Sequence, residues 1–186
     1  MTHGAGARIL VVDDEPAILR AVQTNLGRHD FRVDTAATAR EALDAFETAR
    51  VENGSNDHRH HIAHIQVVHP DDIPRFAALS ATANMQALWA THEPQMDVLT
   101  IPFLGPERAG RQYLFGDLLR SGARLAAGSD WAVSSANPMR AVHVAVNRSL
   151  PGAVGAEAEP FLPAQGLELA EALAAYTAGS AYVNHL

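Results

Sequence analysis

The stretch that decides the fold lies near the start of the chain and reads Arg8-Ile9-Leu10-Val11-Val12-Asp13-Asp14-Glu15-Pro16. A short run of apolar, mostly branched residues is typical of a buried strand, and the acids and proline after it are typical of the first turn of a helix. The same alternation of an apolar run with a helical-period stretch recurs about five times along the chain. This repetition predicts βα units around a parallel sheet, and hence an α/β fold.

The apolar spacing also places the individual elements. Between residues 92 and 113 we expect an irregular segment, a length of loop that in compact domains usually has a function. We expect Asp71 and Asp72 to cap the helix that follows the third strand and to complement its dipole. The predicted strands are residues 8–12, 31–35, 62–68, 82–89 and 123–128, and the predicted helices are residues 14–26, 38–49, 70–79, 115–121, 138–147 and 167–176.

The composition indicates an acidic protein with enough apolar residues for a core. The net charge is -7, the pI is about 5.7 and 47% of the residues are hydrophobic. Phosphate backbones and anionic membranes are bound by clustered Lys and Arg, so this balance argues against nucleic acid and membrane partners. The lack of cysteine excludes disulfides and thiolate metal sites. Because no apolar run approaches the roughly 20 residues of a membrane helix and the start lacks a signal-peptide pattern, we expect a cytoplasmic protein.

A specific motif spans residues 7–16 and continues through residues 31–43. This part of the chain resembles the first half of a response-regulator receiver domain, which is flavodoxin-like. The resemblance implies that Asp13 and Asp14 are the remnant of a Mg²⁺ site, because a hard cation prefers carboxylate oxygens. The acceptor aspartate of that family is not in place, since the third predicted strand leads into His69. We therefore expect at most weak Mg²⁺ binding; the alternative is a helix start with acids and no metal.

A longer set of motifs follows, at residues 59–66, 69–76, 83–86, 104–108 and 127–131. Their order and spacing agree with one family over more than a hundred residues. This part of the chain resembles the C-terminal barrel strands of the metal-dependent amidohydrolases, in the formamide deformylase-like branch. The resemblance implies that His64 is a metal ligand and that Asp130 is a ligand and the general base.

The ligand set that the resemblance supplies is short. Catalytic zinc sites use three protein ligands with a fourth position open, and only His64 and Asp130 have counterparts here. We therefore expect weak Zn²⁺ binding. If the strand extended backwards, His58 and His60 would share a face with His64 and make a partial ligand set. The alternative is that these are loop and strand-edge histidines without a metal.

The two resemblances divide the chain into a receiver-like β-α-β-α segment, residues 1–50, and an amidohydrolase-like segment of three βα units and a C-terminal helix, residues 51–186. We expect them to form one joint domain. Five βα units fit a flavodoxin-like doubly wound sheet. The alternative is a partly open half-barrel derived from a TIM barrel, whose exposed edge would favour a homodimer.

The main functional hypothesis from the sequence is a chimeric α/β scaffold without native catalytic or phosphorelay activity, because neither ancestral site is complete. Two alternatives remain. One is a metal-dependent amidohydrolase that acts on amide C–N bonds with a reduced site at His64 and Asp130. The other is a receiver-like signalling module acting through Asp13 and Asp14.

Overall fold

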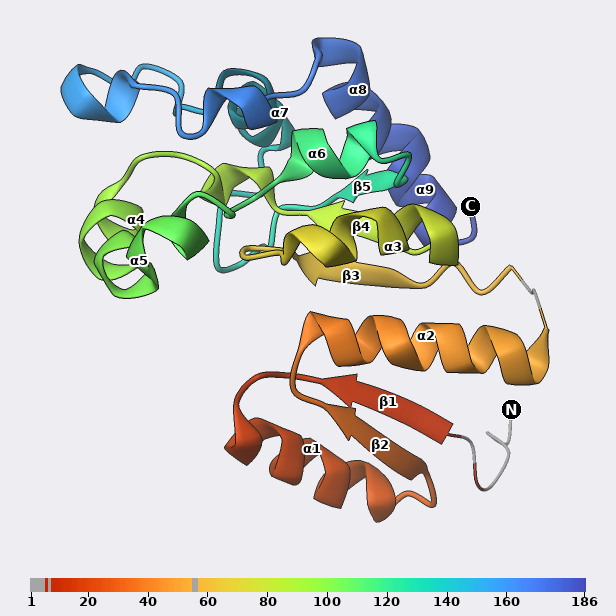
Figure 1. Ribbon diagram of the computed structural model, residues 1–186. Helices are drawn as coiled ribbons and strands as arrows, with labels where there is room; N and C mark the ends of the chain where they lie inside the picture. Colours follow the sequence, from red (N-terminus) through yellow and green to blue (C-terminus); the bar gives the residue numbers. More distant parts are fainter. Residues whose placement is uncertain (1–5, 7, 55–56) are drawn as a thin grey trace. The chain divides into compact units, whose positions relative to one another are not determined.

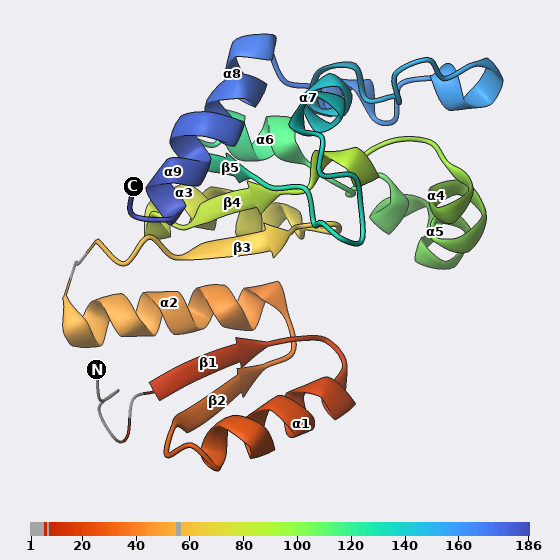
Figure 2. The same ribbon diagram turned by 180° about the vertical axis from the view of Figure 1, so that it is seen from behind.

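The computed structural model describes residue 6, residues 8–54 and residues 57–186. The chain divides into two compact units, Met1–Asp57 and His58–Leu186. Each unit contains its own parallel sheet with helices packed against it (Figures 1 and 2).

The first unit is a two-stranded sheet between two helices. Strands β1 (Arg8–Val12) and β2 (Arg32–Ala36) pair in parallel. Helices α1 (Pro16–Gly27) and α2 (Ala39–Asn53) cover opposite faces of this sheet (Figures 1 and 2). Helix α2 begins where the Thr38 hydroxyl accepts the Glu41 amide N–H at 3.2 Å, which satisfies an N–H that the first helical turn leaves free.

The second unit contains a three-stranded parallel sheet in the order β3-β4-β5. The strands are β3 (His61–His64), β4 (Thr82–Met85) and β5 (Leu125–Ala127). The central strand β4 is almost entirely buried, as is expected of a parallel strand with both faces covered. Because both strand pairs are parallel, the carboxyl ends of all three strands lie at one edge of the sheet.

Helices cover both faces of this sheet. Helices α3 (Ile73–Leu79) and α6 (Phe115–Arg120) pack on one face, while the C-terminal η5 (Ala175–Gly179) and α9 (Ser180–Val183) pack against β5 from the other (Figures 1 and 2). Helices α4 (Pro94–Leu99) and α5 (Ile101–Ala109) lie beyond the carboxyl ends of the strands (Figures 1 and 2). The other helical elements of this unit are η1 (Pro70–Asp72), η2 (Ala87–Trp89), α7 (Pro138–Asn147), η3 (Gly155–Ala158), η4 (Pro163–Gln165) and α8 (Leu169–Ala174).

The core of the second unit is formed by apolar side chains from these layers. Phe76 of α3 and Phe115 and Leu118 of α6 are fully buried on one face of the sheet. Met85 of β4 and Val144 of α7 are buried as well. Burying a side chain of this size stabilises a fold by about 1.5–3 kcal/mol, so this packing holds the strand ends in place.

The α/β class predicted from the sequence is confirmed, but the five-unit flavodoxin-like sheet is not. The strands form two sheets, because β1 pairs with β2 while β3 pairs with β4. The prediction of an irregular segment between residues 92 and 113 is wrong. Helices α4 and α5 occupy most of it, and α5 has a kink at Gly105, where φ is 73°. Glycine and proline usually interrupt helices, so the Gly105-Pro106 pair made the sequence between residues 92 and 113 look irregular.

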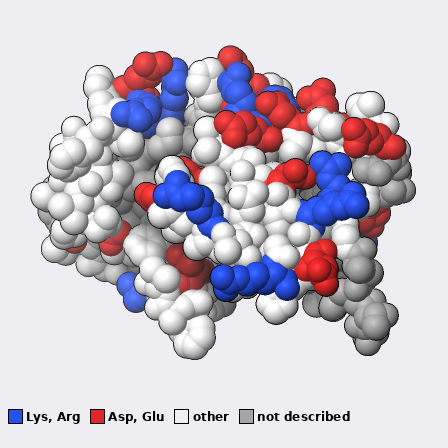
Figure 3. Space-filling view, turned by 90° about the horizontal axis from the view of Figure 1, so that it is seen from below, with Lys and Arg blue, Asp and Glu red and all other residues white. Residues whose placement is uncertain are grey.

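No helix in the described part of the chain is long and apolar enough to cross a membrane. On the face seen from below, acidic and basic side chains are interspersed (Figure 3).

Candidate functional site

The candidate site lies at the carboxyl edge of the β3-β4-β5 sheet. His64 is the last residue of β3, and Gln86 directly follows β4. Gly128, Ser129 and Asp130 directly follow β5. The sheet thus brings the two residues that the family resemblance singled out, His64 and Asp130, to the same edge. This is the edge where ligands bind in parallel α/β folds.

Both predicted ligand positions have a left-handed backbone. The φ angle is 63° at His64, 56° at Ile65 and 58° at Asp130. Left-handed backbone is uncommon for residues other than glycine, and for a β-branched residue such as Ile65 it is a true outlier. Such residues cluster at active sites and ligand clamps, where the surrounding structure maintains them. Left-handed residues elsewhere in the described chain include Ser80 and Arg148, which end helices, whereas these three stand at the carboxyl ends of strands.

Gln86 connects the ends of two strands. Its Oε1 accepts the backbone N–H of His64 at 2.6 Å, and its Nε2 donates to Oδ1 of Asn84 at 3.2 Å. The side chain is only 5% exposed, so these bonds are shielded from competition with water. A Cβ at Gly128 would lie 3.5 Å from the Gln86 Nε2, which places the start of the Asp130 loop against the same amide. Gln86 therefore fixes the backbone that carries His64.

The loop after β5 is held around Asp130. Its carbonyl oxygen accepts the N–H of Val133 at 2.8 Å and of Ser134 at 3.0 Å. Ser129 accepts the N–H of Trp131 through its hydroxyl at 3.2 Å. These bonds are made by the Asp130 carbonyl and by Ser129, and they leave the Asp130 carboxylate uninvolved. The next residue, Trp131, is 73% exposed.

The donor types at this edge suit zinc, but the donor number is short. Imidazole and carboxylate are common zinc ligands. Among the described residues, however, there is no group of three or more His, Cys, Asp or Glu side chains that could hold a metal ion. His64 and Asp130 of this chain therefore fit a metal centre in chemistry and in their place on the sheet, and they do not complete one by themselves.

The alternative histidine set is not formed. Strand β3 begins only at His61, so the period-two alternation that would align His58 and His60 with His64 does not reach them. Instead, the rings of His58 and His60 stack on each other with centroids 5.3 Å apart. Burial, together with the neighbouring His58 and His61, lowers the pKa of His60. These residues make a small aromatic cluster at the entry to the strand.

The acidic pair of the first unit is engaged at a helix start. Oδ1 of Asp13 accepts the N–H of Glu15 at 2.8 Å, while Asp14 is exposed. Glu15 in turn accepts the N–H of Ala17 at 3.3 Å and so caps α1. This geometry uses one Asp13 oxygen for the turn into the helix. Mg²⁺ binding at Asp13 and Asp14 stays a prediction.

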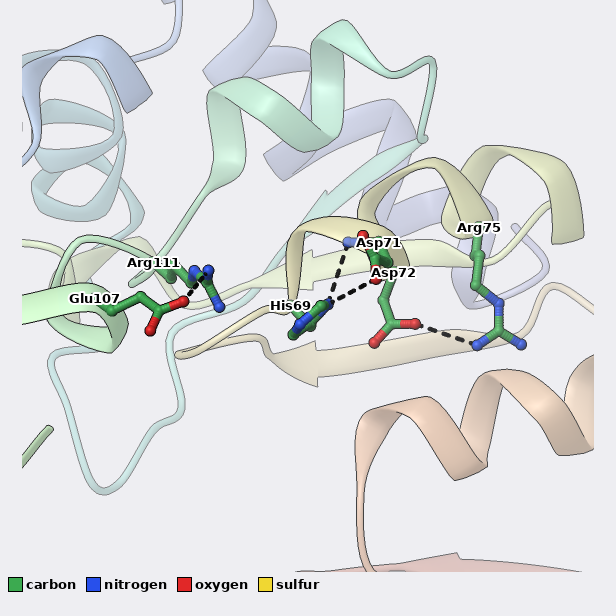
Figure 4. A network of polar contacts seen from close by, with 6 residues as sticks. All are labelled: His69, Asp71, Asp72, Arg75, Glu107 and Arg111. Carbon is green, nitrogen blue, oxygen red and sulfur yellow. Dashed lines mark hydrogen bonds and ion pairs between the residues drawn. The ribbon is translucent and has the colours of Figure 1, made fainter.

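The other acidic pair, after β3, takes part in a polar network (Figure 4). The His69 side chain, rather than an aspartate, caps η1 by accepting the Asp71 N–H at 3.3 Å. Asp72 is buried and pairs with Arg75 at 3.2 Å, one turn further along the helix. Figure 4 also shows Arg111 and Glu107, which pair on α5 and the turn after it. The predicted helix capping by aspartate is therefore replaced by a histidine cap and an ion pair.

Two residues that hold the backbone at this edge, Gln86 and Tyr176, could not be assigned this role from the sequence. Gln86 acts through an amide side chain on a backbone N–H, and Tyr176 donates its hydroxyl to the Gly128 carbonyl at 3.1 Å. Neither contact has a spacing rule that connects residues so far apart in sequence. Gln86 lies inside the strand predicted over residues 82–89 and inside a family motif, residues 83–86, but neither of these assigns it a contact with the His64 backbone.

Comparison with solved structures supports the fold. An uncharacterized metal-dependent hydrolase from Pyrococcus furiosus matches with a TM-score of 0.58 and 22% identity, over 95% of this chain and 36% of that chain. Another from Pyrococcus horikoshii OT3 matches with a TM-score of 0.61 and 24% identity, over 98% of this chain and 38% of that chain. At these identities the likeness is one of fold.

Comparison of sequences identifies the family. Protein LONG AFTER FAR-RED 3 of Arabidopsis thaliana is 33% identical over 147 residues, which are 77% of this chain and 24% of that protein. The chain thus spans about a quarter of this curated relative. The model of the amidohydrolase family matches residues 11–186. The resemblance of residues 51–186 to amidohydrolases is confirmed at the level of the family. The formamide deformylase-like branch and a separate receiver origin for residues 1–50 stay predictions. Because the match covers nearly the whole chain, including α1, β2 and α2, the chain belongs to the amidohydrolase family.

Proposed function

We propose that this chain supplies part of the metal centre of an amidohydrolase that hydrolyses amide C–N bonds. In this proposal His64 is a metal ligand and Asp130 is a ligand and the general base. The observation that carries it is the left-handed backbone at both residues, at the carboxyl edge of one parallel sheet. Membership of the amidohydrolase family and the description of both Pyrococcus proteins as metal-dependent hydrolases support it. These observations favour the amidohydrolase alternative over an inactive scaffold.

Each residue has a distinct role. A bound zinc ion would lower the pKa of a coordinated water to about 7 and polarise the substrate carbonyl. His64 would present a neutral imidazole. The backbone that carries this imidazole is held by the bond from the His64 backbone N–H to the Gln86 side chain. Asp130 would accept a proton from the attacking water and pass it to the leaving nitrogen. Since catalytic zinc needs about three protein ligands, further donors have to join these two.

A zinc titration by calorimetry tests the ligand assignment. We expect the wild-type protein to bind Zn²⁺ weakly, and we expect His64→Ala and Asp130→Asn each to lower the affinity at least about tenfold, because each removes a direct ligand. Matched controls are His185→Ala and Asp44→Asn, which change the same side-chain types at exposed positions, in the turn after α9 and in helix α2. Equal affinity in all five proteins would show that zinc binds elsewhere and would contradict the assignment.

A hydrolysis assay tests the reaction itself. The full chain with added Zn²⁺ would be incubated with formamides and cyclic amides, and wild type would be compared with Asp130→Asn. The proposal predicts slow release of amine from the wild type and none from the variant, since Asn cannot act as a base. Identical rates in the two proteins would count against Asp130 as the base.

A further inference from the structure

We propose that Tyr176 and Ser180 are positioning residues that hold the end of β5 and thereby set the place of Asp130. The proposal rests on the function proposed for Asp130 above. Tyr176 lies in η5 and Ser180 in α9, which follow each other in the C-terminal helical run. Their hydroxyls contact the backbone at the end of β5, just before Asp130. Neither touches the reacting atoms, so they would act through the strand.

The contacts come from side-chain hydroxyls and go to strand carbonyls. Tyr176 Oη donates to the carbonyl oxygen of Gly128 at 3.1 Å. Ser180 Oγ lies 2.7 Å from the carbonyl oxygen of Ala127, its nearer acceptor, and 3.0 Å from the carbonyl oxygen of Ala175 in its own helical run. The carbonyls of Ala127 and Gly128 belong to consecutive residues at the end of β5, immediately before Ser129 and Asp130. Two hydroxyls from one helical run therefore fix the exit of the strand.

A π-helical turn makes this approach possible. Residues Ala175–Gly179 form the π-helix η5, and such turns inside helices occur frequently at functional sites. At Gly179 the helix and strand come so close that an added Cβ would lie 2.1 Å from the carbonyl oxygen of Leu125. The glycine is therefore required for contact between the helix backbone and β5. This contact places Tyr176 and Ser180 on either side of it, within reach of the strand end.

The phenol is suited to act as a permanent donor. Burial raises the pKa of Tyr176 to about 12, so the hydroxyl keeps its proton throughout the physiological range. On the other side of Asp130, its own carbonyl is held by the N–H groups of Val133 and Ser134. The left-handed residue is thus fixed from both directions, by side-chain hydroxyls before it and by backbone amides after it.

Hydrogen exchange of the full chain tests the positioning role directly. In Tyr176→Phe and in Ser180→Ala, we expect the amides of Val133 and Ser134 to exchange about five- to tenfold faster, the factor that corresponds to one lost hydrogen bond. The matched control is Thr177→Val. It removes a hydroxyl from the same helical run, but that hydroxyl donates to the carbonyl of Leu173 within the run and not to β5, so exchange at the loop should not change.

Two outcomes would overturn the proposal. One is unchanged exchange at Val133 and Ser134 in both variants. The other is an equal increase in α3 and β4, which would mean that the contacts stabilise the whole unit and position nothing in particular. Using Ser180→Ala as a second variant keeps the test decisive if Tyr176→Phe fails to fold.

A parallel Zn²⁺ titration separates this proposal from the proposed function. If Asp130 is a ligand, Tyr176→Phe should lower the zinc affinity about 10- to 100-fold, as loss of groups that orient metal ligands does, while Thr177→Val should not. Failure of the wild type to bind zinc would contradict the proposed function, whereas the exchange data would still decide whether these hydroxyls hold the Asp130 loop. Zinc binding that is unaffected by Tyr176→Phe would contradict the positioning role alone.

Discussion

Replacing Gly179 by alanine should destabilise the second unit severely. The added Cβ would lie 2.1 Å from the carbonyl oxygen of Leu125, and 3.1 Å from both the Leu125 carbonyl carbon and the Cα of Ala126. Real Cβ atoms essentially never come closer than 3.0 Å to such atoms, so helix and strand must separate by about 0.9 Å. The obstacle is backbone on both sides, so no side-chain rotation can relieve it.

The size of the effect follows from the contacts that this separation disturbs. Overpacking in a closely packed site costs about 1–3 kcal/mol. The same movement lengthens the bonds of Tyr176 and Ser180 to β5, each of which contributes about 1 kcal/mol net. Alanine in place of a helical glycine returns about 1 kcal/mol through backbone entropy. We therefore expect a loss of about 2–4 kcal/mol in the free energy of unfolding.

Urea unfolding followed by tryptophan fluorescence reports on the second unit, which contains Gly179. Both tryptophans, Trp89 and Trp131, lie in this unit, His58–Leu186. The control is Gly110→Ala in the same unit. Its Cβ would meet only ordinary contacts, at 3.5 and 3.7 Å, and its backbone is right-handed. We expect the control to be neutral or slightly stabilising. If Gly179→Ala unfolded at the same urea concentration as Gly110→Ala, the close approach of η5 to β5 would be refuted.

Further predictions concern the core, the buried phenols and a buried amide. Phe76→Ala should lower the free energy of unfolding by about 3–5 kcal/mol, whereas Phe103→Ala, at a side chain that is 75% exposed, should change it by less than about 0.5 kcal/mol, both measured by urea unfolding. Burial raises the pKa of Tyr113 and of Tyr176 to about 12. In a phenolate absorbance titration both should ionise near pH 12, and their contribution to stability should be lost as the pH rises from 10 to 12, because unfolded phenols release their protons first. Gln165 makes two hydrogen bonds to Asp117 of α6, of 2.9 and 3.0 Å. Gln165→Met should therefore lower the free energy of unfolding by about 1–3 kcal/mol in the same assay. No loss would mean that other partners satisfy Asp117.

Elements specified by local chemistry could be predicted from the sequence. Strand β1 and helix α7 have the bounds expected from the apolar run at residues 8–12 and from the helical period after Asn137. Helix α7 begins as predicted because a proline follows a residue that can cap, and the Asn137 side chain does accept the N–H of Met139 at 3.0 Å. These signals lie within one turn of the element that they specify.

Features that depend on distant partners could not be predicted. Strand β3 was expected to run to Val68, because Ile65, Val67 and Val68 continue its apolar pattern. It ends at His64, since Ile65 adopts a left-handed backbone and donates its N–H to the Ala63 carbonyl at 2.8 Å. The pairing of strands into two sheets is equally non-local. Periodicity shows that a strand exists and not which neighbour it will have.

The candidate site was only partly visible in the sequence for a related reason. His64 and Asp130 could be found because their side chains belong to a family motif. Gln86 acts on the backbone that carries one of these residues, and nothing in its own neighbourhood shows that. Gln86 belongs to the candidate site because the parallel pairing of β3 with β4 brings the ends of the two strands together.

The choice of residue at the left-handed positions also bears on function. Positive φ occurs at glycines in turns, as at Gly122 and Gly152, and at residues that end helices, such as Ser80 after α3 and Arg148 after α7. At the ends of β3 and β5 the same conformation is adopted by His64, Ile65 and Asp130, although it costs a residue with a Cβ about 1–2 kcal/mol. Glycine at His64 or Asp130 would allow the same backbone path without that cost. Both side chains belong to residues at the carboxyl edge of one parallel sheet, where imidazole and carboxylate are donor types that a hydrolytic metal centre uses. The zinc titrations of His64→Ala and Asp130→Asn therefore distinguish a metal site from a turn that merely tolerates the cost.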